Sequence, residues 1–284
     1  FISLVIPAKW YSGGKGLDEF REKMLHDKRI RYLADFRDSR DAFSGVDVAG
    51  GVCYFLWSRD DPGRCRVETF DKGESFVAIR DLDEFGMFVR DNQALEIIHK
   101  VIESEFESLS ALVSSRKPFG IPAAQISDPL GDCFMFSSVG DGKIRRSDVP
   151  KGIHLIDKWK VLVSKTSSEH AGQSDKAGTR RVLSRIEVMP PGSICTESYL
   201  VLGPFGSEAE ARRMQQYLRT RFVRYLVSTI LLTQNVTKSM FQFVPRPDLN
   251  RDSSDEDLFQ KYGLSDREIE AICKLIRQIE DSND

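Results

Sequence analysis

Residues 207–245 read SEAEARRMQQYLRTRFVRYLVSTILLTQNVTKSMFQFVP and combine a capping motif, an amphipathic pattern and a polar run. Ser207 and Glu210 have the spacing of a capping box, in which both side chains accept hydrogen bonds from backbone N–H groups at a helix start. Apolar side chains then recur every three or four positions, at Ala211, Met214, Leu218, Phe222, Tyr225 and Leu226. This period predicts one helix of roughly twenty residues with a single apolar face.

Two further features of this stretch favour a nucleic-acid partner. Arginines occupy much of the remaining helix surface, at Arg212, Arg213, Arg219, Arg221 and Arg224. Residues 233–238, TQNVTK, follow as a polar run whose groups can bind base edges or phosphates. A packed helix with a solvated arginine face is the alternative, and the stretch alone leaves both interpretations open.

Charge is distributed unevenly along the 284 residues, although the net charge is only −2. Residues 143–246 hold 18 lysines and arginines against 8 acidic residues, a net charge of +10. Residues 1–142 and 247–284 each carry a net charge of −6. A basic middle between acidic ends predicts a local site for a polyanion such as double-stranded DNA.

Cysteine and histidine usage restricts the compartment and the site chemistry. The five cysteines are scattered, odd in number and never spaced as CxxC, which indicates reduced thiols and a cytoplasmic protein. The four histidines lack the spacing of common zinc sites, so no metal is expected. Residues 1–6, FISLVI, are too short to span a bilayer, and no membrane partner is expected. Because the sequence starts inside this apolar run, it is predicted to be a piece of a longer protein.

The first part of the chain, residues 1–115, has the pattern of an α/β domain. Residues 2–6 form a nearly continuous apolar strand, which is typical of burial on both faces. Further strands are expected at 30–36 and 52–57, with 65–70 returning as the second arm of a hairpin with 52–57. Helices are expected at 17–26 and 94–113. The glycine-rich loop at 13–16 is not a phosphate-binding P-loop, because Lys15 is followed by glycine where that motif has serine or threonine.

Two further segments are expected beyond a stiff, proline-bounded connector at 116–122. Residues 116–246 show short strands and turns before the helix that starts at Ser207, which indicates an α+β domain. Residues 247–284 form a polar linker and a helical tail, with a second capping box at Ser265 and Glu268. The tail is interpreted as a helix that docks on the preceding domain, with a partner interface as the alternative.

The assembled pattern resembles the C-terminal part of adenine-N6 DNA methyltransferases of bacterial restriction-modification systems. Residues from about 125 to 245 also resemble the DNA-reading halves of type I specificity subunits. The likeness covers nearly the whole chain, though each motif is short: VIPAKW at 5–10, AFSGV at 42–46, GVCYFLW at 51–57, DKWKV at 157–161, PGSICT at 191–196 and FVRYL at 222–226. It implies the C-terminal half of a Rossmann-like methyltransferase sheet at 1–115, a DNA target recognition domain at 116–246 and the helical tail.

Two hallmarks of that family are missing from the sequence. It contains neither a glycine-rich cofactor motif after a strand nor Asn-Pro-Pro-Tyr. In the family these bind S-adenosylmethionine and hold the adenine amino group, so both are expected upstream of Phe1, in an N-terminal catalytic half. The full-length protein is therefore expected to use S-adenosylmethionine. This fragment alone is expected neither to bind it nor to methylate DNA, and no catalytic or cofactor-binding residue is assigned in it.

The resemblance also assigns site residues. Phe43 matches the aromatic position that stacks on the flipped target base, with a buried core phenylalanine as the alternative. The basic charge of the middle segment and the polar run at 233–238 predict, apart from the resemblance, duplex DNA binding at Lys158, Lys160, Lys165, Arg180, Arg181, Thr233, Gln234, Asn235 and Lys238.

Other classes of protein remain open at this point. The chain could be a non-catalytic DNA-specificity module that works with separate subunits, or the methylase and specificity part of a fused restriction endonuclease. A restriction subunit is a possible partner in either case. The sequence has no convincing Asp…Glu-x-Lys nuclease cluster and no His-Asn-His site.

Overall fold

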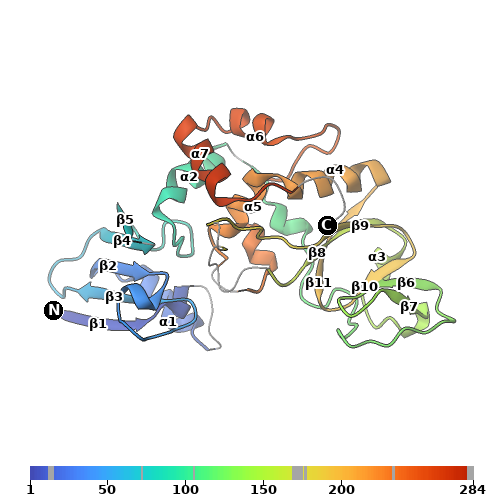
Figure 1. Cartoon of the computed structure of the whole chain (residues 1–284), viewed down its shortest axis with the longest axis horizontal. Coiled ribbons are helices and arrows are strands. Elements are labelled where there is room, and N and C mark those ends of the chain that lie inside the picture. The colour runs from blue at the N-terminus through green and yellow to red at the C-terminus, as the bar shows by residue number, and fades with distance from the viewer. Residues whose placement is uncertain are drawn as a thin grey trace. The chain divides into compact units, whose positions relative to one another are not determined.

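The computed structural model describes residues 1–11, 16–71, 73–104, 106–167, 175, 178–231 and 234–279. The chain divides into two compact units. The first takes in Phe1–His99 and the described part of Ser228–Thr233, and the second takes in the other described residues. Figure 1 shows the strands of the first unit in blue to cyan and those of the second in green to orange.

A five-stranded sheet forms the first unit, in the order β1-β3-β2-β4-β5. Its strands are β1 (Ile2–Pro7), β2 (Ile30–Phe36), β3 (Val52–Trp57), β4 (Cys65–Asp71) and β5 (Glu74–Arg80). Only the β2–β4 pair is parallel, while the other neighbours are antiparallel. The predicted strand positions are therefore confirmed, but the predicted hairpin of 52–57 with 65–70 is wrong. β2 lies between those two strands, and β4 forms its hairpin with β5.

The expected burial of the first strand on both faces is also wrong. Ile2, Leu4 and Val5 are 47%, 50% and 54% exposed. β1 lies at the edge of the sheet and, among the described strands, pairs only with β3. A run of apolar residues marks a strand but does not say how many neighbours cover it, which depends on the rest of the fold.

The core of the first unit combines one face of this sheet with the segments around it. Leu33 and Phe55 face each other across β2 and β3. They join Leu25 of α1 (Asp18–His26) and the aromatic rings of Trp10 and Tyr11 in one buried cluster. Trp10 and Tyr11 belong to a 3₁₀ turn that directly follows β1, so the end of β1 is anchored in this core.

The helix expected at 94–113 is shorter than predicted. α2 runs from Leu95 to Glu103, and a separate 3₁₀ turn covers Leu109–Leu112. Ser104 donates to the carbonyl oxygen of Val101 at 2.7 Å, and the Ser108 hydroxyl accepts from the amide of Ser110 at 3.2 Å. Serine side chains compete with the helical backbone for its own hydrogen bonds, which ends the helix although the apolar period continues.

Two three-stranded sheets form the centre of the second unit, ordered β10-β6-β7 and β11-β8-β9. The strands are β6 (Cys133–Phe136), β7 (Gly142–Ile144), β8 (Trp159–Ser164), β9 (Ile186–Met189), β10 (Ser193–Cys195) and β11 (Tyr199–Phe205). A short helix, α3 (Ile153–Ile156), precedes β8. One buried cluster joins both sheets through side chains that include Met135, Leu162, Met189, Ile194 and Val201. The expected mixture of short strands and helices is confirmed.

The long helix expected after Ser207 is two helices, α4 (Glu208–Arg219) and α5 (Arg221–Ser228). Thr220 separates them with an extended backbone, φ −60° and ψ 149°. The fully buried Arg224 donates through Nε to the carbonyl oxygens of Arg219 and Thr220, at 3.0 and 3.2 Å. The interruption at Thr220 thus leaves two backbone carbonyl oxygens without helical partners, and Arg224 of α5 donates hydrogen bonds to both. The predicted apolar stripe is nonetheless buried along both helices.

Both predicted caps are present, the first in altered form. Ser207 Oγ accepts from the amide of Glu210 at 3.2 Å, but the Glu210 carboxylate accepts from the amide of Gly206 at 2.9 Å instead of that of Ser207. Ser265 and Glu268 form the complete box at the start of α7 (Asp266–Leu275).

The tail packs within the second unit, as predicted for a docking helix. α6 (Asp255–Lys261) begins with Asp255, whose carboxylate accepts from the amides of Arg221 and Phe222 at 3.0 and 2.9 Å and so caps α5. The Tyr262 ring stacks on Phe222 at 5.1 Å.

The structure is mixed α/β with several sheets, in agreement with the predicted class. The likeness of the first sheet to half of a Rossmann-like sheet stays a prediction. None of the helices in the described ranges is long and apolar enough to cross a membrane.

Candidate functional site

Phe43 lies on the loop of residues 37–50, which leaves β2 and enters β3. Its side chain is 43% exposed, so it is not the buried core phenylalanine of the alternative interpretation. Pro7 at the end of β1 pairs with Val52 at the start of β3. The amide of Ala8 donates to the carbonyl oxygen of Gly51 at 3.0 Å. The loop therefore sits at the carboxyl end of β1, where sheets of α/β proteins gather ligand sites.

The loop is closed internally by one buried hydroxyl. Ser39 is 1% exposed; its Oγ donates to the carbonyl oxygen of Val46 at 2.7 Å and accepts from the amide of Val48 at 2.9 Å. The amide of Phe43 donates to the carbonyl oxygen of Ser39 at 2.9 Å. A ring that faces solvent is thus carried on a backbone with defined hydrogen bonds.

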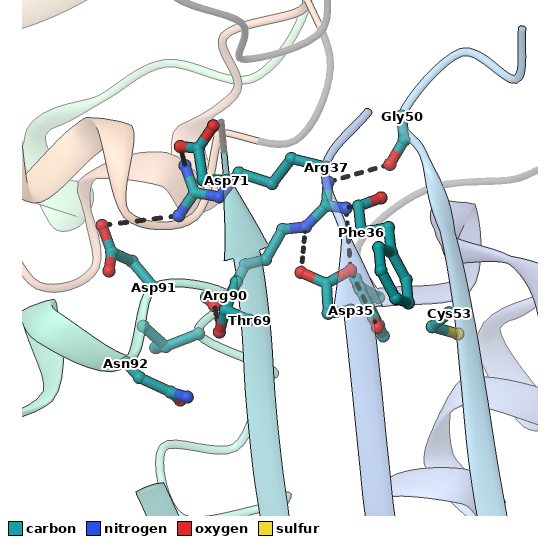
Figure 2. Close-up of polar contacts among 12 residues, drawn as sticks. Asp35, Phe36, Arg37, Gly50, Cys53, Thr69, Asp71, Arg90, Asp91 and Asn92 are labelled. Carbon is teal, nitrogen blue, oxygen red and sulfur yellow. Dashed lines mark hydrogen bonds and ion pairs between the residues drawn. The ribbon is translucent and has the colours of Figure 1, made fainter. Parts of the chain in front are cut away.

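A buried ion pair lies directly beneath the loop. Asp35 on β2 is fully buried, and Arg90, which follows β5 in the chain, is 5% exposed. Arg90 donates through Nε to Oδ2 of Asp35 at 2.5 Å and through Nη2 to Oδ1 at 2.8 Å, as Figure 2 shows. Tyr11 Oη donates to the same Oδ1 at 3.2 Å. Both charges are therefore paired by hydrogen bonds inside the core.

Burial and charge shape the electrostatics of this cluster. Burial alone lowers the pKa of the Arg90 guanidinium, but the Asp35 carboxylate raises it more, so the net shift is upward. Burial, aided by the Asp35 charge, holds the pKa of Tyr11 well above its usual value. Arg90 therefore stays charged, and Tyr11 stays protonated as a hydrogen-bond donor, throughout the neutral range.

A second arginine lies beside the pair at the same end of the sheet. Arg37 approaches Asp71 at 3.8 Å and Asp91 at 3.4 Å (Figure 2). Asn92 donates to the carbonyl oxygens of Val67 and Phe76 at 3.0 and 2.8 Å, which ties this segment to β4 and β5.

In the second unit, two predicted DNA-binding segments lie side by side although about seventy residues separate them. Thr166 and Asn235 form an antiparallel bridge. The amide of Ser167 donates to the carbonyl oxygen of Gln234 at 2.8 Å, and the amide of Val236 donates to that of Lys165 at 2.7 Å. We call residues 165–167 and 234–238 the paired loops. Asn235 and Lys238 are exposed on them, and Lys165 and Gln234 are half-buried.

Two of the predicted DNA contacts must be corrected. Lys160 is fully buried, and its ammonium donates to the carbonyl oxygens of Lys158 and Ile156 at 2.7 and 3.1 Å. Arg180 is 6% exposed, with backbone hydrogen bonds to Leu275 and Arg277 that place it under the C-terminal segment. Neither side chain can reach a phosphate in this conformation. The sequence could not separate these basic residues from exposed ones, because their burial depends on segments distant in the chain, such as Leu275 and Arg277 beside Arg180.

The remaining predicted contacts are distributed as follows. Lys158 is exposed, just before β8. Arg181 is half-buried, and its carbonyl oxygen accepts from Arg224 at 3.2 Å. Thr233 lies outside the described residues.

The free energy of unfolding is expected to depend on pH through Lys160. Burial lowers the pKa of Lys160 to about 8. Between pH 8 and the ordinary lysine value near 10.4, the unfolded chain keeps a proton that the folded chain has released. Stability should therefore rise with pH over this window, by about 3 kcal/mol from this residue. Buried thiols such as Cys65 and Cys195, whose pKa is raised by burial, act in the opposite direction over this window, so the Lys160 contribution is measured as a difference between proteins. In urea unfolding at pH 7 to 10, the unfolding free energy of the wild type relative to Lys160→Met should rise with pH, whereas that relative to Lys158→Met, at an exposed neighbour, should stay constant. A wild-type value relative to Lys160→Met that does not change with pH would contradict the assignment.

The ion pair of Asp35 and Arg90 was missed at the level of sequence, although a signal existed. β2 reads IRYLADF, and alternation puts Asp35 on the inward face with Leu33. A charge on an inward strand position calls for a buried partner. No group of three or more histidine, cysteine or acidic side chains suited to a metal ion occurs within the ranges that the structure describes.

Comparison with known proteins relates parts of the chain to methylases. Residues 1–43 match the Eco57I restriction-modification methylase family. A stretch of 70 residues is 31% identical to an uncharacterized adenine-specific methylase of Mycoplasma pneumoniae (strain ATCC 29342 / M129 / Subtype 1), covering 24% of this chain and 17% of that protein. The chain thus spans less than two thirds of that relative's length.

A solved structure of the type IIG restriction endonuclease BpuSI is similar over 93% of this chain and 42% of its own, with 10% identity and a TM-score of 0.33. Both sequence matches are to methylases, one of them a restriction-modification family.

Proposed function

We propose that this chain is the C-terminal part of an adenine-N6 DNA methyltransferase of a restriction-modification system, and that it reads the DNA sequence for that enzyme. Residues 1–115 complete the catalytic domain, 116–246 form the target recognition domain and 247–284 support it. Five free thiols, four of them buried, favour a reducing compartment such as the cytoplasm.

The single observation that carries the DNA-reading role is the pairing of the two loops. It brings the backbone of Lys165 next to the segment that carries Gln234, Asn235 and Lys238. Lysine neutralises phosphates, and asparagine or glutamine can bind an adenine edge through two hydrogen bonds. Positioning and base-reading groups therefore occur on the same short surface.

The role of Phe43 follows from the chemistry of the target. An adenine inside a duplex cannot reach a methyl donor, so the enzyme must flip it out at a cost of a few kcal/mol. An exposed ring at the carboxyl end of β1 offers a stacking surface, and base–aromatic stacking returns about 1–3 kcal/mol. In this proposal Phe43 holds the flipped base next to the N-terminal catalytic half.

Binding of duplex DNA should depend on salt through the exposed lysines. Replacing Lys158, Lys165 and Lys238 together with glutamine should weaken binding to all sequences. The slope of log affinity against log salt should fall by about 0.9 for each phosphate that a lysine no longer neutralises. Fluorescence anisotropy of labelled duplex DNA, measured at about 50 to 200 mM salt, gives the affinity and its salt slope.

The matched control for that experiment is Lys23→Gln, a lysine of α1 that is 73% exposed. It should leave the slope at the wild-type value. If the triple variant kept both its affinity and its slope, the DNA surface would have to lie elsewhere on the chain.

The full-length enzyme is proposed to use S-adenosylmethionine, which supplies the methyl group when bound. Residues 1–284 alone should show no binding of S-adenosylmethionine in titration calorimetry and no transfer of labelled methyl groups to DNA, because the sequence lacks both hallmark motifs. The same chain should still bind duplex DNA, which serves as the control for folding. Micromolar cofactor binding by residues 1–284 would contradict the division of labour proposed here.

A further inference from the structure

Both ends of the loop that carries Phe43 meet the same side chain. Arg90 donates through Nη2 to the carbonyl oxygen of Phe36, the last residue of β2, at 3.1 Å. It donates through Nη1 to the carbonyl oxygen of Gly50, two residues before β3, at 2.8 Å. Figure 2 shows the guanidinium between these two carbonyls, with Asp35 on its other side. One buried group therefore ties together the start and the end of residues 37–49.

The approach of the two ends is close, which explains the glycine at the entry to β3. Gly51 has φ +81°, and a Cβ atom there would lie 2.0 Å from the carbonyl oxygen of Phe36. Any larger residue would push β3 away from β2 at this point. The carbonyls that Arg90 binds are thus held within reach of one guanidinium by the backbone itself.

Only an arginine has the donors for this arrangement. Its planar fork carries five N–H groups, enough to pair with a carboxylate on one edge and still bind two carbonyls. The Asp35 carboxylate fixes the orientation of the fork, and Tyr11 fixes the carboxylate through Oδ1. Lysine would keep the charge but, as a point donor, could not span all four acceptors.

A second closure lies inside the first. The Ser39 hydroxyl joins the carbonyl oxygen of Val46 to the amide of Val48. The amide of Phe43 donates to the carbonyl oxygen of Ser39. The amide of Val46 donates to the carbonyl oxygen of Phe43 at 3.2 Å. The position of the exposed ring is therefore set by two nested sets of hydrogen bonds, the outer one made by Arg90 and the inner one by Ser39.

We propose that Arg90, together with Ser39, positions Phe43 for stacking on the flipped base. The inference rests on the proposed function of Phe43. Ordering a loop at the moment of binding costs free energy, and a loop that is already ordered avoids that cost. Arg90 does not touch the base; it is a positioning residue whose effect passes through the loop backbone.

Hydrogen exchange on residues 1–284 tests the positioning without DNA. In Arg90→Lys, the amides of Val46 and Val48 should exchange about tenfold faster than in the wild type, because the loop opens locally. The matched control is Arg80→Lys. Arg80 is a second buried arginine of the same unit, 3% exposed, and it donates to the carbonyl oxygen of Val89 and not to the loop. Equal exchange of the two amides in both variants would overturn the proposal.

Ser39→Ala keeps the test decisive if Arg90→Lys unfolds the first unit. It removes the inner closure and leaves the ion pair in place. The same two amides should again exchange about tenfold faster, with the strands of the sheet unchanged. Wild-type exchange at Val46 and Val48 in Ser39→Ala would show that these contacts do not order the loop, and would overturn the proposal.

A second measurement separates this inference from the proposed function. In the full-length enzyme, 2-aminopurine at the target position reports base flipping, and Arg90→Lys should lower kcat and the flipped-base signal while KM for DNA stays unchanged. Phe43→Ala should do the same. If the loop opens in Arg90→Lys but neither variant alters the 2-aminopurine signal, the role of Phe43 fails, and with it the positioning role of Arg90. If only Phe43→Ala alters it, Phe43 stacks but Arg90 does not position it.

Discussion

Phe43→Leu in the full-length enzyme is expected to slow methylation about tenfold to a hundredfold while the melting temperature of the fold stays nearly unchanged. The rate falls because the absence of a stacking interaction of about 1–3 kcal/mol reduces the population of flipped adenine. Stability changes little because Phe43 is already 43% exposed and leucine keeps an apolar side chain for the part that is buried. Single-turnover methylation, 2-aminopurine fluorescence at the target base and a thermal melt measure the three quantities.

Phe20→Leu is the matched control for this substitution. Phe20 lies on α1 in the same unit and is 41% exposed, so it removes a comparable ring from a different surface. It should leave the methylation rate and the 2-aminopurine signal at wild-type values. A large drop in melting temperature for Phe43→Leu with a normal fluorescence signal would exclude Phe43 from the active site.

Arg90→Met is expected to destabilise the first unit by about 3–5 kcal/mol. The substitution leaves the Asp35 carboxylate buried without its partner, and an uncompensated charge in a core is among the most costly defects in a protein. It also removes the hydrogen-bond donor of the carbonyl oxygens of Phe36 and Gly50. Urea-dependent hydrogen exchange of the β2 and β4 amides measures the loss within this unit.

The double variant Asp35→Leu/Arg90→Met provides the control that isolates the charge. Replacing both partners of a buried ion pair by apolar side chains is often neutral, so most of the stability should return. Recovery should be incomplete, because the two carbonyls at the ends of the loop stay without their donor. If Arg90→Met were as stable as the wild type, the ion pair would have no structural importance.

The difference between the two predictions reflects two kinds of residue at one end of the sheet. Phe43 is exposed and should affect activity more than stability. Arg90 and Asp35 are buried and should affect stability first, and activity only through the loop. Arg90→Lys, which keeps the charge, is therefore the more informative variant for function.

Local sequence patterns determined much of the fold of this protein. Strand positions, the cap at Ser265 and the buried stripe from Ala211 to Leu226 agree with the structure, because alternation, capping and helical period act over a few residues. The position of Phe43 in a loop between two strands was predictable for the same reason, but its exposure was not, because a buried core phenylalanine fitted the sequence as well. The match of residues 1–43 to restriction-modification methylases likewise follows from sequence alone.

Only the tertiary structure decided which strands are neighbours and which charges are buried. β2 inserts between β3 and β4, so the expected hairpin does not form. Lys160 and Arg180 resemble surface residues in sequence, yet both are buried. Asp35 and Arg90 are brought together from positions 55 residues apart. Such pairings depend on chain closure between distant segments, which no local period encodes, and that is why the ion pair under the Phe43 loop emerged only from the folded chain.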